Sequence, residues 1–263
     1  MNRKVIYTCI VGNYDPIRQP LVVDDSFDYI CFTDNCESDK VGVWEIRPIP
    51  ETKETDKTRM SRYVKIRPHK ALEEYDYSLY IDANIQIATA GFYEFVNKRI
   101  DEGHLICQVP HLKSNCIYEE IRKAYFAGKV NLTDAKAQYQ HLKDNGFPSL
   151  YGLYENNIIL RKHNDNNIKQ ISEDWWTEYC SFSNRDQFCL MYVYWRNNIM
   201  ASYLFDEKHN TRNIDCINYI YHDNNKKLEN TVALLNKNNQ IRRVGRFFHT
   251  VIKKYFIRKY LSE

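Results

Sequence analysis

The order of apolar and polar positions predicts strands alternating with helices along most of the chain. Three apolar runs near the start, KVIYTCIV (4–11), YICFTD (29–34) and VWEIRPI (43–49), lie between turn-rich segments and predict strands. Residues 55–67 have a helical pattern that Pro68 ends, and PHKALEEYD then predicts a short helical turn. The run YDYSLYIDANIQI (75–87) predicts the next strand.

The second half of the chain continues the alternation. The pattern predicts helices over 91–103, 116–129, 132–148, 167–180 and 185–198, and strands over 104–110, 153–162 and 201–205. Thr133 is the expected N-cap of the helix over 132–148 and Gly146 its C′ residue; Ser183 or Asn184 is the expected N-cap of the last helix. Such alternation predicts an α/β fold with a mainly parallel sheet and helices on both faces, which binds ligands at the carboxyl ends of its strands.

Length and composition favour one large α/β domain. The 263 residues, 43% hydrophobic and 27% charged, are enough for a single core. We expect this domain to cover residues 1–225, and residues 226–263 to form a polar linker and a C-terminal helix. The eight cysteines include no CxxC pair, so buried reduced thiols are expected.

Positive charge is concentrated at the C-terminal end of the chain. A net charge of +3 does not indicate nucleic-acid binding. Residues 241–261, however, combine apolar positions at helical spacing with seven cations, Arg242, Arg243, Arg246, Lys253, Lys254, Arg258 and Lys259. Two interpretations stay open: a cationic amphipathic helix in an anionic membrane interface, or a terminal helix docked on the body. With no signal peptide or membrane-spanning run, we expect a cytoplasmic protein, with peripheral contact to the inner face of the cell membrane under the first interpretation.

The tripeptide Asp82-Ala83-Asn84 is a candidate metal site. In an extended segment residues i and i+2 point the same way, so the Asp carboxylate and the Asn carbonyl could face one hard cation such as Mg²⁺ or Mn²⁺. The alternative is that Asp82 only caps the strand end. His222, after an apolar run, is a further candidate ligand.

A basic segment precedes this strand. If it is helical, Arg62, Lys65 and His69 share a face suited to a diphosphate, whereas a solvated helix face is the structural alternative. Two polar clusters follow: Glu155, Asn156 and Asn157 at a strand start, and Arg185, Asp186 and Gln187 at a helix start. They could bind sugar hydroxyls, but turn chemistry and helix capping also explain them.

Several motifs together resemble a known family. YTCIVGNYD, YICFTD, KIRPHKAL with YDYSLYIDANI, CIYEE and SNRDQ, spread over residues 4–200, resemble the glycosyltransferase-like family that joins bacterial surface-polysaccharide proteins to plant Golgi proteins connected with seed mucilage. The motif order is more distantly similar to glycosyltransferase family 8. The positions that match it are Tyr7 and Thr8, Asp82 to Asn84, Asn156 and Asn157, Asp186 and Gln187, and His222. Asn84 departs from the usual third Asp, and the Gly and Lys-Pro-Trp that normally follow the late His are absent.

The resemblance implies a GT-A fold and a nucleoside diphosphate sugar, often UDP-linked, as donor. Under it Tyr7, Thr8 and Asp34 contact the nucleoside, the basic segment contacts the diphosphate, and Asp82, Asn84 and His222 bind Mn²⁺ or Mg²⁺. Asn156, Asn157, Asp186 and Gln187 then contact the donor sugar or acceptor. The acceptor is a glycan or a polyprenyl-linked glycan of a surface or capsular polysaccharide.

The resemblance to family 8 also implies a retaining reaction without a dedicated base, whereas an inverting reaction would make Glu155 or Asp186 the candidate base. Two other classes remain. Asn84 would suit a binding module that has lost catalysis, and a hydrolase is disfavoured because no GxSxG or histidine-rich zinc motif is present.

Overall fold

The computed structural model describes residues 2–12, 14–50 and 52–220. The chain separates into two compact units, Met1–Tyr219 and Ile220–Glu263. The fold below is that of the first unit. The predicted boundary at residue 225, His222 and the amphipathic segment 241–261 lie outside the described residues, and they stay predictions.

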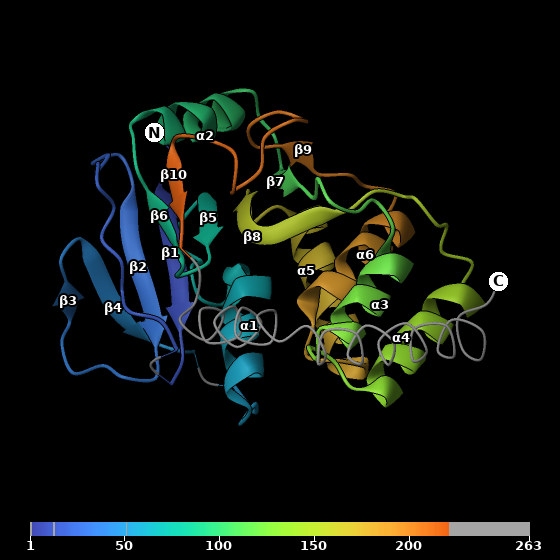
Figure 1. The fold of residues 1–263 in the computed structure, drawn as a ribbon. Coiled ribbons are helices and arrows are strands. Elements are labelled where there is room, and N and C mark those ends of the chain that lie inside the picture. The colour runs from blue at the N-terminus through green and yellow to red at the C-terminus, as the bar shows by residue number, and fades with distance from the viewer. Residues whose placement is uncertain (1, 13, 51, 221–263) are drawn as a thin grey trace, which may run out of the picture. The chain divides into compact units, whose positions relative to one another are not determined.

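The first unit is built on an eight-stranded mixed sheet, with strand order β3-β4-β2-β1-β5-β8-β7-β9 (Figure 1). Its strands are β1 (Lys4–Ile10), β2 (Asp28–Thr33), β3 (Lys40–Val41), β4 (Trp44–Pro48), β5 (Tyr77–Ile81), β7 (Ile106–Pro110), β8 (Tyr154–Arg161) and β9 (Ser202–Tyr203). Only β3 and β8 run against the other strands of this sheet. The predicted α/β fold with a mainly parallel mixed sheet is therefore confirmed.

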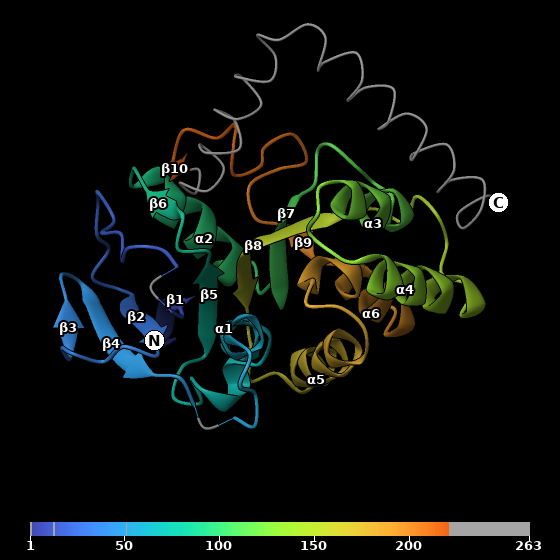
Figure 2. The ribbon, with the colours of Figure 1, turned by 60° about the horizontal axis from the view of Figure 1, so that its bottom comes forward.

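Alternating residues of the strands cover the two faces of this sheet. One set, including Ile6, Leu79 and Leu160, packs in a single core cluster with residues of α2 (Gly91–Asp101). The opposite face carries Tyr7 and Arg161, whose side chains contact the end of α1 (Lys57–Ile66). Helices therefore cover both faces, as the sequence predicts, and α2 and α1 lie on opposite sides of the strands in Figure 2.

Four helices gather beside the β8 and β7 end of the sheet (Figure 2). They are α3 (Ile117–Phe126), α4 (Leu132–Asp144), α5 (Asn166–Ser181) and α6 (Leu190–Arg196). Two short 3₁₀ helices, η1 (Pro68–Lys70) and η2 (Asp186–Phe188), follow α1 and precede α6. No helix within the described ranges is long and apolar enough to cross a bilayer.

The predicted strand over 75–87 is in fact two strands. β5 ends at Ile81, a turn occupies Ala83 and Asn84, and β6 (Ile85–Ile87) pairs with β10 (Ile217–Tyr219) in a separate two-stranded sheet. A hydrogen bond from the Ile85 amide to the Asp82 carbonyl closes the turn. The expectation that one extended strand runs through Asp82 and Asn84 is therefore wrong, and the strand spacing no longer supports a shared direction of the two side chains.

The helix caps also differ in part from prediction. The N-cap of α4 is Asn131, which accepts a hydrogen bond from the Asp134 amide, and not Thr133. Gly146 follows the C-cap Asn145 at a φ of 70°, the left-handed conformation expected of a C′ glycine. Neither Ser183 nor Asn184 caps a helix, because Arg185 precedes a single 3₁₀ turn and α6 begins only at Leu190.

Candidate functional site

The site centres on Asp82, where two strands of opposite direction bring different parts of the chain together. Asp82 follows the carboxyl end of β5, and the amino end of β8 lies beside it because these strands are antiparallel. The Asp82 amide donates a hydrogen bond of 2.8 Å to the carbonyl of Asn157. The two motifs, 75 residues apart in sequence, thus adjoin at one edge of the sheet.

The Asp82 carboxylate is held on one side and open on the other. Its Oδ1 accepts a hydrogen bond of 2.8 Å from the Tyr80 hydroxyl and lies 3.5 Å from the Lys65 ammonium. Its Oδ2 receives no hydrogen bond from a described residue, and its side chain is 33% exposed. The carboxylate is fixed in direction and keeps one oxygen for a ligand.

Lys65 is a buried cation between two acids. Its side chain is only 2% exposed, and its ammonium lies 2.8 Å from Asp186 Oδ2 as well as 3.5 Å from Asp82 Oδ1. Burial raises the pKa of Asp186, but the nearby Lys65 and Arg62 cations outweigh burial and hold this pKa well below its usual range. Asp186 is therefore ionised at neutral pH, and it is a weak proton acceptor.

Arg62 lies one turn before Lys65 on α1 and completes the cluster. Its Nε lies 3.4 Å from Asp186 Oδ1, and its side chain is 25% exposed. Two cations and two carboxylates, those of Asp82 and Asp186, nearly balance here. The predicted diphosphate contact fits the partly exposed Arg62, but the buried Lys65 has little surface to offer a ligand.

A second buried cation fastens the end of α1 to the sheet. Arg161, at the end of β8 and 2% exposed, donates to the carbonyls of Lys65 and Ile66 and to the hydroxyl of Tyr7. The last turn of a helix carries unpaired carbonyls and a partial negative charge, which a buried guanidinium satisfies. Arg161 thereby fixes the backbone from which Lys65 projects.

His69 does not join this cluster. The helix ends at Ile66, and His69 falls in η1, where its Nε2 lies 2.7 Å from Glu173 Oε1 of α5. Arg67 pairs with the same carboxylate at 2.8 Å. The expected shared face of Arg62, Lys65 and His69 is wrong, because Pro68 turns the chain towards α5.

The predicted nucleoside contacts lie at the ends of β1 and β2. Asp34 Oδ1 accepts a hydrogen bond of 2.8 Å from the Gly12 amide, and Lys57 Nζ lies 3.9 Å from Asp34 Oδ2. Tyr7 and Thr8 are 0% and 3% exposed. The burial of these two side chains does not fit a contact with the nucleoside. Asp34, in contrast, directly follows the carboxyl end of β2.

The start of β8 anchors a loop instead of presenting a free base. Each oxygen of Glu155 accepts two hydrogen bonds: Oε1 from Arg212 and Asn210, Oε2 from Asn157 and Thr211. All these donors except Asn157 belong to the loop before β10. With both oxygens engaged, Glu155 does not fit the role of the catalytic base.

The neighbouring amides are engaged in part, since Asn156 Nδ2 and Asn157 Oδ1 are buried without a hydrogen-bond partner among the described residues. Asn156 Oδ1 accepts from Gln108 Nε2, which belongs to a buried chain with the Tyr194 hydroxyl. Gln187 Nε2 donates a hydrogen bond of 2.6 Å to the carbonyl of Tyr154. The side-chain contacts of Gln187 and Asn156 tie η2 and β7 to the start of β8.

The described domain matches the model of a known protein family. Residues 1–219 match the family described as TOD1/MUCI70, glycosyltransferase-like domain. The chain belongs to the TOD1/MUCI70 family. The resemblance to a glycosyltransferase-like family that the motifs indicate is therefore confirmed. No curated protein matches the sequence of this TOD1/MUCI70 domain.

Three solved structures that resemble the TOD1/MUCI70 domain are two glycosyltransferases and a mannan synthase. The bifunctional glycosyltransferase WbbM matches with a TM-score of 0.44 and 11% identity over 77% of this chain and 38% of its own. Mouse xyloside xylosyltransferase 1 matches with a TM-score of 0.44 and 8% identity, over 76% of this chain and 84% of its own. Core-mannan synthase A of Aspergillus fumigatus, in its Mn/GDP form, matches with a TM-score of 0.40 and 10% identity, over 77% and 71% of the two chains. The chain thus spans well under half the length of WbbM.

The residues of the TOD1/MUCI70 domain fit a divalent cation only in part. Asp82 offers a fixed carboxylate with one open oxygen, the ligand type that Mn²⁺ and Mg²⁺ prefer. Asn84 is 3% exposed and has an interaction of its own. No group of three or more His, Cys, Asp or Glu that could hold a metal is present among the described residues. Asp82 therefore fits as a ligand, and Asn84 fits poorly.

Three further residues of the site, Tyr80, Arg161 and Arg212, are not among those predicted from the sequence. Tyr80 precedes Asp82 by two residues, so the period of a strand could have placed both on one side. Arg161 is a charged residue at the end of an apolar strand, and this position in the sequence could have indicated a buried cation that binds other parts of the fold. Arg212 lies in a polar loop, and no pattern in the sequence pairs it with Glu155.

Proposed function

We propose that the protein transfers a sugar from a nucleoside diphosphate sugar, with UDP the favoured nucleotide, to a glycan or polyprenyl-linked acceptor. One observation carries the proposal. In a chain of a glycosyltransferase-like family, a partly exposed carboxylate at the carboxyl edge of the sheet adjoins a buried Lys65–Asp186 pair and Arg62. The acceptor would belong to a surface or capsular polysaccharide.

The residues of the site have separate tasks in this proposal. Asp34 lies where the nucleoside would bind, and Arg62 faces the diphosphate. Breaking the anomeric C–O bond builds negative charge on the leaving phosphate, and fixed positive charge nearby stabilises that charge. A Mn²⁺ or Mg²⁺ ion held by Asp82 would supply further positive charge at the diphosphate.

Charge balance supports a need for that cation. Arg62 and Lys65 are already matched by Asp82 and Asp186, so the cluster alone carries little net charge for an incoming diphosphate. His222, predicted as another ligand, would have to come from the part of the chain after the described residues. The site is therefore expected to bind the donor weakly without a divalent cation.

The state of the two candidate bases supports a retaining reaction. The low pKa of Asp186 and the four hydrogen bonds to Glu155 leave neither carboxylate suited to accept a proton from the acceptor. In a retaining transfer on the same face of the sugar, the leaving phosphate can take that proton. No dedicated base of the protein is then required.

A thermal-shift screen of UDP-, GDP- and CMP-sugars with and without Mn²⁺ tests the proposal. We expect a UDP-sugar to raise the melting temperature in the presence of Mn²⁺. Asp82→Asn should remove the part of this stabilisation that depends on Mn²⁺, and Asp101→Asn, an exposed acid at the end of α2, is the matched control. No response to any nucleotide would contradict the proposal.

Turnover separates the transferase from the binding module. Incubating the full chain with the stabilising donor should release free nucleoside diphosphate, slowly with water and faster with a suitable acceptor. Binding without release of the nucleotide under any condition would instead identify a nucleotide-sugar binding module.

A further inference from the structure

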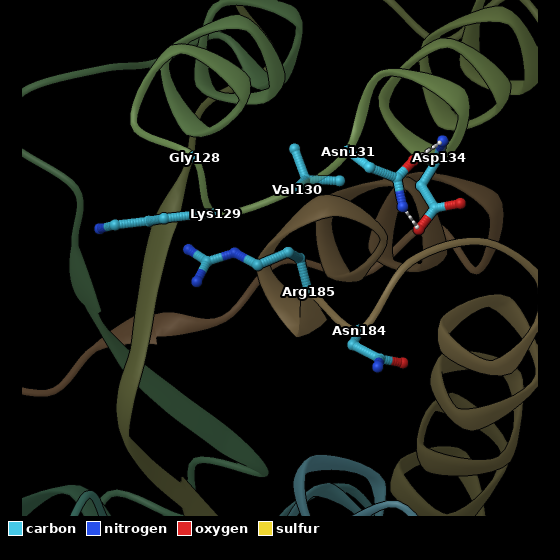
Figure 3. A pocket seen from close by; sticks show the side chains of 7 residues that line it. All are labelled: Gly128, Lys129, Val130, Asn131, Asp134, Asn184 and Arg185. Carbon is cyan, nitrogen blue, oxygen red and sulfur yellow. Dashed lines mark hydrogen bonds between the residues drawn. The ribbon is translucent and has the colours of Figure 1, made fainter.

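A pocket next to the site is lined by two cations, Lys129 and Arg185. Its volume is about 360 Å³, and it is lined by residues 128–131, Asp134, Asn184 and Arg185. Figure 3 shows the Lys129 and Arg185 side chains extending on the same side, away from Asn131 and Asp134. A pocket of this size is within the range that binds small molecules, and it could hold one sugar unit.

The two cations form no hydrogen bond or ion pair with a described residue, although the Arg185 guanidinium lies 5.9 Å from the centre of the Phe188 ring. The Nε of Arg185 is buried without a hydrogen-bond partner among the described residues. Asp134 Oδ2, in contrast, accepts a hydrogen bond of 2.9 Å from Asn131 Nδ2. A buried donor of a charged group costs free energy unless a ligand or water satisfies it, and an oxyanion satisfies a guanidinium best.

The backbone around Arg185 separates this pocket from the Asp82 cluster. Arg185 is extended, with φ −115° and ψ 98°, so its side chain points away from those of its two neighbours. Asn184 Oδ1 accepts a hydrogen bond from Arg59 of α1, and Asp186 pairs with Lys65 and Arg62 of the same helix. Arg185 therefore faces away from the proposed diphosphate site, although it is adjacent in sequence to a residue of that site.

We propose that this pocket binds an anionic group of the acceptor, a carboxylate or a phosphate, through Arg185 and Lys129. The inference rests on the proposed function and specifies it: the acceptor is an acidic glycan or a glycan phosphate. Because the segment 184–186 is shared, an acceptor anion at Arg185 would lie next to the donor held on the other side of that segment. The acceptor is thus selected by charge and brought beside the site of transfer.

Binding of a charged and an uncharged sugar to the full chain tests this inference. The probes are methyl β-glucuronide, methyl β-glucoside and inorganic phosphate, and NMR titration gives the dissociation constants. We expect the glucuronide to bind about tenfold more tightly than the glucoside, since one charge-assisted hydrogen bond contributes roughly this factor. Phosphate that binds as tightly as the glucuronide would also support the inference, with phosphate as the anion.

Three variants show which side chains cause the tighter binding of the glucuronide. Arg185→Gln should weaken glucuronide binding about tenfold, and Lys129→Gln, whose side chain is exposed, about threefold. Lys162→Gln removes an exposed lysine at the far end of β8 and should change nothing. Equal binding of the two sugars, or an unchanged affinity in Arg185→Gln, would overturn the inference.

Two further outcomes separate this inference from the proposed function. Displacement of the glucuronide by UDP alone would assign the pocket to the donor and overturn the acceptor assignment. If the wild-type protein responds to a UDP-sugar but has no preference for the charged sugar, only the acceptor inference fails. If it responds to no nucleotide, the proposed function fails as well.

Discussion

At the scale of residues, Lys65 shows how position within a helix decides the role of a charge. The sequence places Lys65 in a basic run that suits a ligand or a solvated face. In the structure it points inward, because Val64, Lys65 and Ile66 at the end of α1 are all buried against the sheet. The composition of the run was informative about the site, but the depth of each cation depends on the packing of α1, which the sequence does not reveal.

The buried pair gives a first prediction at this scale. Lys65→Met should lower the free energy of unfolding by about 3 kcal/mol, because among the described residues it leaves the buried Asp186 carboxylate with Arg62 as its remaining ion-pair partner. Asp186→Asn should be destabilising for the converse reason. Urea denaturation of both variants and of the double variant measures the coupling, which we expect to be about 2 kcal/mol. Strictly additive losses would show that the two side chains do not depend on each other.

Several site residues could be predicted from the sequence and others could not. Asp82, Arg62 and Asp186 lie close together. The order of the motifs indicates this, and so does the tendency of α/β sheets to bind ligands at the carboxyl ends of their strands. Asn84 and His69 were misplaced for local reasons, a turn after β5 and a change of direction at Pro68. Contacts such as Glu155 with Arg212 join positions 57 apart, and the pattern of a single sequence carries no signal for them.

At the scale of elements, β8 organises the second half of the site. It lies antiparallel between β5 and β7, so its amino end adjoins the carboxyl ends of both neighbours. The sequence predicted the strand, because LYENNIILRK contains the apolar run Ile158–Leu160 after Leu153 and Tyr154. Its direction was not predictable from that pattern, since a fully buried strand reads the same in parallel and antiparallel pairing.

The attachment of the loop before β10 to β8 gives an element-scale prediction. Glu155→Gln replaces one acceptor oxygen by an NH₂ group facing donors of Arg212, Asn210, Thr211 or Asn157. Amide hydrogen exchange in residues 206–213 should become about tenfold faster, as a loss of roughly 1.4 kcal/mol in local stability implies. Glu207→Gln, an exposed acid in the same loop, is the control and should leave exchange unchanged. Unaltered exchange in Glu155→Gln would mean that other contacts hold the loop.

At the scale of the whole molecule, the two interpretations of the basic C-terminal segment differ in what its removal does. For the membrane interpretation, deleting residues 241–263 should abolish sedimentation with phosphatidylglycerol vesicles and leave the melting temperature unchanged, because cationic amphipathic helices bind anionic interfaces. For the docked-helix interpretation, the deletion should lower the melting temperature instead. Vesicle binding that survives the deletion would exclude the membrane role of this segment.

The two edge strands of the eight-stranded sheet affect how readily the protein aggregates at high concentration. Both outermost strands, β3 and β9, are two residues long, and the strands they cover end in Pro48 and Pro110. Short edges offer few free backbone groups, and proline offers no N–H at all. Another chain therefore finds little backbone on which to add a strand, which protects the folded unit from edge-to-edge aggregation.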